Sequence, residues 1–311
     1  MAKDIKRFSH SRINAFRNCP RKHHYLYVEG IQVPDSPETL PGRLFHECVE
    51  LTLKGQSIDK PLDEFRKACQ TGKLDMEPDL LEYIVSLYFQ YYSKDYSSEE
   101  TLMVEKEFED KLDDDDYFVA KVDQVFELHG YNTLRDIKTT RNALKYTHED
   151  VLFNQQLLIY VPFVESLLGS KVNAIQIDEV RLAKLTEVPM TTKGKPSTDK
   201  KLLGLVTAEA YEAKLKEIGM FGYSEFEPTL DYLRQRGHPL FRRVTAQIVS
   251  EQVVSNNAAD FLSAYRAAKS DPDYRVKGPL CRYCPFEELC KLDYESPDQS
   301  SREMIIKKIS E

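Results

Sequence analysis

The stretch from Val119 to Thr140 constrains the fold most, because its pattern is typical of a β-hairpin. Two runs rich in β-branched and aromatic residues flank a turn at His129–Asn132. Asp123 interrupts the first run, and the second ends in Asp136-Ile137-Lys138. Side chains alternate along a strand, so Asp136 and Lys138 are expected on one face and Ile137 on the other. Pairing of the two strands would bring Asp123 close to Asp136.

Two carboxylates and an ammonium group gathered in this way would form a small site with hard ligands. Such ligands suit Mg²⁺ or Mn²⁺, and a nearby lysine can orient a water molecule or stabilise a phosphate. The same spacing also fits a solvated strand face that carries a weak surface ion pair. The position of the acids favours the site, since an unpartnered carboxylate in an apolar run is costly.

The rest of the chain alternates between helix and strand patterns. Helices are expected at 8–18 (opened by Ser9 or Ser11), 21–28, 43–54, 61–71, 78–92, 148–160, 206–219, 224–237 and 253–269, and strands at 102–109, 117–128, 133–138, 172–185 and 242–251. This order predicts an α/β fold in which helices flank a mixed central sheet. We find no internal repeat and no clear linker, so residues 1–311 are expected to form a single domain.

Two polar segments are expected to be loops. The acidic run Asp113–Asp116 lacks the spaced ligands and the glycine of a calcium loop, so it is interpreted as a solvated hairpin tip. The segment Thr186–Lys201 contains glycine and prolines and is expected to be a long loop.

The net charge of −8 does not by itself indicate a nucleic-acid-binding protein. The charge is uneven, however, because the 24-residue stretch from Ile5 to Val28 contains six Lys or Arg residues, three His and no acid. A second basic stretch covers Tyr274–Arg282. Such local charge could bind phosphates, although a solvated charged face explains it equally well.

The sequence shows no sign of membrane insertion. The segment Met1–Arg7 is polar and is not followed by the apolar region of a signal peptide. The most apolar run, Leu157–Leu168, is interrupted by Pro162 and Glu165 and is shorter than the roughly 20 residues of a membrane-spanning helix. A cytoplasmic location is expected.

Six cysteines are present, and a disulfide framework is not expected in a cytoplasmic protein. Cys281, Cys284 and Cys290 have the spacing C-x2-C-x5-C, typical of a metal or cluster site that lacks its fourth ligand. Four thiolates can bind either Zn²⁺ or a 4Fe–4S cluster, and spacing alone does not choose between them. Cys48 and Cys69 lie in helical stretches and are expected to be small apolar residues of the core.

In their order along the chain, these motifs resemble the PD-(D/E)XK nuclease superfamily. Within it they are similar to RecB-like exonucleases with an iron–sulfur cluster, such as the nuclease domain of AddB, the CRISPR-adaptation exonucleases and many phage proteins. The matching segments are Cys19–Pro20, Gly42–His46, Val122–Asp123, Asp136–Lys138, Gln156–Tyr160 and Cys281–Cys290. Each segment alone also fits ordinary packing or surface chemistry, but six in the expected order favour the family. The resemblance covers residues 8–292, loosely over 186–276, and Asp136 stands where many members have glutamate.

The resemblance implies a restriction-endonuclease-like core and assigns roles to individual residues. His46, Asp123, Asp136 and the Ile137 carbonyl would bind one or two Mg²⁺ or Mn²⁺ ions. Lys138 would position the attacking water and stabilise charge in the transition state. The residues expected to shape the site or contact the DNA backbone are Gln156, Tyr160, Arg12 and Arg21. Glu105 or Glu107 on the preceding strand would add a further carboxylate.

The resemblance also implies a 4Fe–4S cluster held by Cys19, Cys281, Cys284 and Cys290. One distant cysteine and a closely spaced trio are similar to the arrangement in this family, whereas zinc sites commonly use two close pairs. The cluster would join residues 1–30 and 270–295 into one module. Its expected role is structural, closing the basic N-terminal segment over the nuclease core.

The implied function is a metal-dependent DNA exonuclease that acts on DNA ends, with a preference for single strands, in recombination, repair or CRISPR-like processing. DNA would be the substrate, and a recombinase, helicase or CRISPR-type protein would be the partner. The loop Thr186–Lys201 could then act as a flap beside the DNA. One alternative is a structure-specific endonuclease, and another is a scaffold that binds DNA ends without cleaving them.

Overall fold

The structure is a computed structural model that describes residues 6–113, 115–248, 250–270, 272–295 and 299–310. Some residues of the predicted segments lie outside the described residues. These are residues 1–5 of the polar N-terminus and basic stretch, Asp114 of the acidic run, Val249 of the last predicted strand and Asp271 of the predicted cysteine module.

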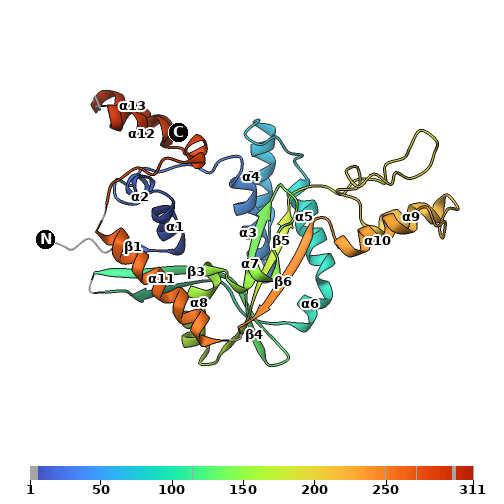
Figure 1. The fold of residues 1–311 in the computed structure, drawn as a ribbon, viewed down its shortest axis with the longest axis horizontal. Helices are drawn as coiled ribbons and strands as arrows, with labels where there is room; N and C mark the ends of the chain where they lie inside the picture. The colour runs from blue at the N-terminus through green and yellow to red at the C-terminus, as the bar shows by residue number, and fades with distance from the viewer. Residues whose placement is uncertain (1–5, 114, 249, 271, 296–298, 311) are drawn as a thin grey trace.

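A mixed sheet of six strands forms the centre of the molecule (Figure 1). Its strands are β1 (Lys6–Phe8), β2 (Glu100–Lys111), β3 (Asp116–Leu128), β4 (Tyr131–Thr140), β5 (Val172–Arg181) and β6 (Phe241–Gln247). The order is β1-β3-β4-β5-β6, with β2 also paired to β3. The predicted hairpin is confirmed, because β3 and β4 pair antiparallel with Gln124 opposite Arg135. The predicted α/β class with a mixed sheet is also confirmed.

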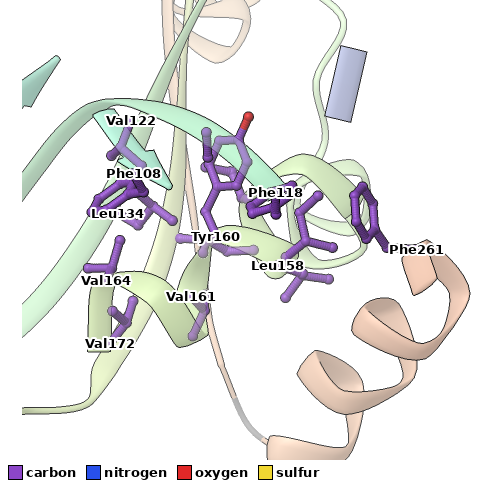
Figure 2. Close-up of a cluster of buried hydrophobic side chains, with 14 of the residues drawn as sticks. Phe108, Phe118, Val122, Leu134, Leu158, Tyr160, Val161, Val164, Val172 and Phe261 are labelled. Carbon is purple, nitrogen blue, oxygen red and sulfur yellow. The ribbon is translucent and has the colours of Figure 1, made fainter. Parts of the chain in front are cut away.

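Helices cover the two faces of this sheet (Figure 1). On one side, α8 (Gln155–Leu168) and α11 (Glu251–Lys269) bury an apolar cluster that includes Leu134, Ile177 and Phe261. Figure 2 shows part of this cluster, with Tyr160 of α8 near Phe118 and Leu158. A second cluster surrounds α3 (Leu40–Leu53), α4 (Asp59–Gln70) and α5 (Leu80–Tyr91), and it includes Ile137. Thus Leu134 and Ile137, three residues apart on β4, belong to different cores.

Residues 186–237 build a projection with its own small core (Figure 1). It contains α9 (Ala208–Glu217) and α10 (Glu227–Arg236), which pack through Tyr211, Leu215 and Leu230. The predicted loop Thr186–Lys201 has neither helix nor strand, apart from one isolated bridge between Met190 and Pro196. The helix at 224–237 begins at Glu227, later than predicted.

The N-terminal and C-terminal segments lie side by side (Figure 1). Helix α1 (His10–Asn18) begins at the N-cap Ser9, as one of the two predictions had it, and α2 (Pro20–Tyr27) follows. A short 3-10 helix, η1 (Pro279–Tyr283), leads to α12 (Glu287–Glu295) and α13 (Gln299–Ser310). Tyr25, Phe286 and Leu289 form the small core that joins these segments.

The prediction of a solvated acidic tip is wrong for Asp116. This residue is buried, and its Oδ2 accepts a 2.8 Å hydrogen bond from the Tyr265 hydroxyl and lies 2.9 Å from Lys269 Nζ. Asp113 bonds the same two partners. The acidic run therefore fastens the β2–β3 hairpin to α11, because two carboxylates gain the partners that buried charge requires.

The predicted helix 148–160 is in fact two helices. Helix α7 (His148–Leu152) ends before Asn154, whose side chain caps α8 by accepting a hydrogen bond from Leu157 N. Helix α8 then continues through Pro162 to Leu168, beyond the predicted end at Tyr160. Five elements were not predicted: β1, α6 (Ser93–Ser98), η1, α12 and α13. In the part of the chain that the structure describes, no helix has the length and apolarity to span a membrane.

Candidate active site

Helix α3 carries His46 to the sheet. Its buried side, which includes Leu44, Phe45 and Val49, packs into the second core. One turn before His46, Gly42 allows close approach to β4, since a Cβ atom at that position would lie 2.5 Å from Thr139 Oγ1. The helix therefore holds His46 against the strands, and its Nδ1 lies 3.4 Å from Asp123 Oδ2.

The two predicted acids meet where β3 and β4 diverge. Strand pairing ends at Gln124 and Arg135, and beyond it Asp123 Oδ2 accepts a 2.8 Å hydrogen bond from Ile137 N. The N–H and C=O of one strand residue point toward the same neighbouring strand. The Ile137 carbonyl therefore faces the side of Asp123 as well, while its side chain is buried in the second core.

Lys138 is held by two partners from different elements. Its Nζ lies 2.7 Å from Asp136 Oδ2, at an angle that makes the contact an ion pair and not a directed hydrogen bond. The same ammonium donates a 2.9 Å hydrogen bond to Gln156 Oε1, and Gln156 Nε2 lies 3.3 Å from Asp136 Oδ1. Gln156 also bonds the side chain of Tyr160 one turn later. Asp136 and Lys138 of β4 and Gln156 of α8 therefore contact one another in a single group.

Glu105 of β2 completes the acid cluster. Ligand atoms of His46, Glu105 and Asp123 all lie within 4.8 Å of one another. Sequence analysis left the choice between Glu105 and Glu107 open, and Glu105 is the one that the structure brings to the site. Its backbone has a φ of +50° in the middle of a strand, a conformation that costs an L-residue about 1–2 kcal/mol.

Burial and mutual repulsion dominate the electrostatics of Asp123 and Glu105, even though Lys121 Nζ lies 2.5 Å from Glu105 Oε2. Burial and then the Asp136 carboxylate raise the pKa of Asp123, and burial and then Asp123 raise that of Glu105. Burial lowers the pKa of His46, which keeps its imidazole neutral and able to act as a ligand. For Lys138, burial acts to lower the pKa, but the Asp136 carboxylate outweighs it and the ammonium form is favoured.

These residues fit a divalent cation. A neutral imidazole and clustered carboxylates are the donors that hold such ions in proteins. A cation would also relieve the repulsion that raises the pKa values of Asp123 and Glu105.

One further side chain at the site was missed by sequence analysis. His10 begins α1, and burial together with the nearby Lys138 ammonium lowers its pKa to about 4. His10 lies far from Lys138 in the sequence, and no local pattern around it signals a site. Only the fold, which places α1 beside β4 and α8, brings the two together.

The DNA contacts of Arg12 and Arg21 remain predictions, and both side chains have partners within the protein. Arg12 is buried, donates a 2.8 Å hydrogen bond to the Arg7 carbonyl and lies over the Phe8 ring. Arg21 is paired with Asp273 at 2.5 Å. Both guanidinium groups fasten the N-terminal helices to their neighbours, since a buried charge is stable only with such partners.

The four cysteines of the predicted cluster occupy one region but do not form a compact ligand set. Cys19 is the N-cap residue of α2, Cys281 lies on η1, Cys284 directly follows η1, and Cys290 lies on α12. Burial raises the pKa of Cys290, and the nearby Cys19 and Cys284 raise it too. Among the described residues, however, no three cysteine sulfurs lie within 4.8 Å of one another.

No curated protein matches this chain. The model of the PD-(D/E)XK nuclease superfamily matches residues 7–291, a span that contains the acids, the lysine and the four cysteines described above. The match agrees with the mixed sheet and with the donors for a divalent metal at its centre. The chain therefore belongs to the PD-(D/E)XK nuclease superfamily.

Proposed function

We propose that this nuclease is a metal-dependent DNA exonuclease that shortens DNA from its ends and prefers single strands. The observation that carries the proposal is the convergence of His46, Glu105, Asp123, Asp136 and Lys138 at one point of the sheet. The resemblance to RecB-like exonucleases supports the action on ends. It also supports a role in recombination, repair or CRISPR-like processing, with a recombinase, helicase or CRISPR-type partner.

Different residues of the chain would have different roles at the scissile phosphate. His46, Glu105, Asp123, Asp136 and the Ile137 carbonyl would hold one or two Mg²⁺ or Mn²⁺ ions. When bound, these ions would polarise the phosphate and lower the pKa of a bound water. Lys138 would orient that water and stabilise developing negative charge. Gln156 keeps the Lys138 ammonium in place through its 2.9 Å hydrogen bond.

End-dependence and metal-dependence can be tested together. Purified protein is incubated with a labelled linear single strand and with a covalently closed circle of the same sequence, in Mg²⁺ or Mn²⁺ and in EDTA. We expect the linear strand alone to be shortened, and only with metal. Cleavage of the circle would favour the endonuclease alternative. Binding without any cleavage would favour the scaffold.

We further propose that Cys19, Cys281, Cys284 and Cys290 hold a 4Fe–4S cluster that joins residues 1–30 and 270–295. Tetrahedral zinc, with Zn–S bonds of about 2.3 Å, would bring the sulfurs to roughly 3.8 Å from one another. The described sulfurs are more widely spread, and a four-iron cluster accommodates such a spread better than a single ion. Anaerobic purification followed by iron, sulfide and zinc analysis tests this. Stoichiometric zinc without iron would contradict it.

A further inference from the structure

The sheet contains a gap beside the active site. Strand β3 pairs with both β1 and β4 on the same edge. The pairing with β1 ends at Phe118, opposite Phe8, and the pairing with β4 begins at Gln124, opposite Arg135. Neither strand reaches residues 119–123 of β3 on that edge. Edge strands expose backbone donors and acceptors that can pair with another chain.

A pocket of about 600 Å³ opens next to this gap. Its size falls in the range of sites that take small molecules or a single residue of a polymer. Val119, Ala120 and Lys121 of β3 line it on one side, and Gln156 and Tyr160 of α8 reach it from the other. Gln156 is also the partner of Lys138. The pocket therefore adjoins the atoms assigned to the reaction.

Its walls combine cationic, hydroxyl and apolar groups. Arg7 of β1 and the exposed Ser11 of α1 can contact an anion, whereas Phe108 and Val119 offer an apolar wall. The ammonium of Lys121 is already paired with Glu105 at 2.5 Å. Ser9 also lines the pocket, but its hydroxyl already accepts a hydrogen bond from Arg12 N as the α1 cap.

Two carboxylates also line the pocket, and they indicate where a phosphate would lie. Glu109 pairs with Arg7 at 3.3 Å, and Glu107 lies on the same strand. A phosphate would therefore avoid the β2 side and bind near Ser11, with Arg7 as its cationic partner.

We propose that this pocket is a subsite for one unpaired nucleotide that flanks the scissile phosphate, with Arg7 and Ser11 as positioning residues. The proposal rests on the proposed nuclease function and specifies where the single strand would bind. A nucleotide has both an anionic group and a flat apolar base, which matches the two kinds of wall. A base can enter the pocket only when it has left the stack, so the ligand is single-stranded DNA or a frayed end.

Arg7→Ala and Ser11→Phe test the pocket, the first by removing a cation and the second by filling the space from an exposed helix position. Lys6→Ala is the matched control, because Lys6 is the exposed cation next to Arg7 on the same strand and does not line the pocket. We expect both pocket variants to raise the KM for a linear single strand by about fivefold or more, a typical effect of one lost phosphate contact. Their kcat should change less than twofold, and Lys6→Ala should match the wild type.

The small diester bis(p-nitrophenyl) phosphate separates the two proposals, because it has no flanking nucleotide. Its hydrolysis should be equal in the wild type and in the pocket variants. Wild-type KM values for DNA in both pocket variants, or an equal loss in Lys6→Ala, would overturn the subsite.

If the wild type hydrolyses neither substrate with metal, the nuclease proposal fails instead. Fluorescence anisotropy with single-stranded DNA in EDTA then decides the subsite: weaker binding by Arg7→Ala than by Lys6→Ala supports it, and equal binding overturns it.

Discussion

The position of the Lys138 ammonium is fixed by contacts with two side chains. The ammonium lies 2.7 Å from Asp136 and 2.9 Å from Gln156, so a strand and a helix together fix its position. An ammonium held in this way loses little freedom when it meets the developing charge of a reacting phosphate, which is the condition for electrostatic catalysis.

Lys138→Ala should lower kcat for linear single-stranded DNA by at least about 100-fold, the usual cost of removing one charge-stabilising donor. The KM and the melting temperature should change little, because the lysine is only partly buried. Lys145→Ala removes an exposed lysine a few residues later and serves as the control. Steady-state rates with Mg²⁺ or Mn²⁺ check this expectation, and a Lys138→Ala enzyme with more than a tenth of wild-type kcat would contradict it.

Strand β2 contains one residue with an unusual backbone conformation, Glu105. The residues before and after Glu105 are both paired with β3, whereas Glu105 itself has a φ of +50°. Backbone strain of this kind tends to persist at functional positions, where the surrounding fold enforces it. The strand places the Glu105 carboxylate beside His46 and Asp123 at the expense of local stability.

Comparison of alanine and glycine at two positions of β2 tests this strain. At Glu105, glycine should be more stable than alanine by roughly 1 kcal/mol, because only glycine adopts a positive φ without penalty. At Glu107 the order should reverse by roughly 0.5–1 kcal/mol, since its backbone is not among the described non-glycine residues of positive φ. Urea unfolding of the four variants in EDTA measures both differences, and the same order at the two positions would argue against strain.

A buried ionic network joins α5 to the sheet. Asp178 of β5 accepts hydrogen bonds from the Tyr88 hydroxyl at 2.6 Å and from Arg243 Nε at 2.7 Å, and Arg135 lies nearby. Burial acts to raise the pKa of Asp178, but the two guanidinium groups outweigh it and hold the pKa below its usual value. The ionised carboxylate therefore stabilises the folded protein.

Asp178→Asn should destabilise the protein at pH 6–7 by on the order of 3 kcal/mol, because it leaves buried guanidinium charge without its carboxylate. A lowered pKa in the folded state means that the carboxylate contributes fully above the unfolded pKa of about 3.9 and loses its contribution as pH falls below it. The difference between wild type and variant should stay constant from pH 7 to 5 and shrink below about pH 4. Thermal melts across this range measure it. Asp63→Asn, which changes a largely exposed ion pair with Arg66, should show less than about 0.5 kcal/mol at any pH.

The same elements show what local sequence patterns can and cannot predict. The β3–β4 hairpin was predictable because alternation and a turn signal are local properties of the chain. The break at Asn154 was missed because a helix and its successor have the same apolar period, and the capping side chain is the only local mark. Strand β1 has three residues, and its pairing with β3 depends on distant sequence. The burial of Arg12 and the approach of His10 to Lys138 likewise depend on how α1 packs.

At the scale of the whole molecule, the two ends of the chain form one unit. The Arg21 amide donates a 3.1 Å hydrogen bond to the Tyr274 carbonyl, and the Tyr25 hydroxyl donates one of 2.7 Å to Asp293. Helix α13 lies outside the part matched by the superfamily model. It nevertheless packs its Ile305, Ile306 and Ile309 against the small core of Tyr25, Phe286 and Leu289, against which Cys284 and Cys290 also pack.

Arg302 is the polar anchor of α13. It donates 2.7 Å hydrogen bonds to both carboxylate oxygens of Glu29 and one of 3.0 Å to Asp293. Charge-assisted bonds of this kind are the stronger ones in proteins. A helix held by them over half-buried cysteines limits the access of solvent and oxidants to the thiols.

Arg302→Ala should therefore make Cys284 and Cys290 react severalfold faster with a thiol reagent in cofactor-free protein. Lys308→Ala, which breaks the largely exposed pair with Glu288, should react at the wild-type rate. Cys48, buried far from α13 in the core of α3, provides an internal reference whose reactivity should stay low in all three proteins. Mass spectrometry of the labelled cysteines resolves each site.

Equal labelling of Cys284 and Cys290 in the two variants would mean that α13 does not protect them, whereas a rise at Cys48 as well would indicate global unfolding. Selective labelling would show that the C-terminal helix works together with the N-terminal helices to keep the cysteine region closed.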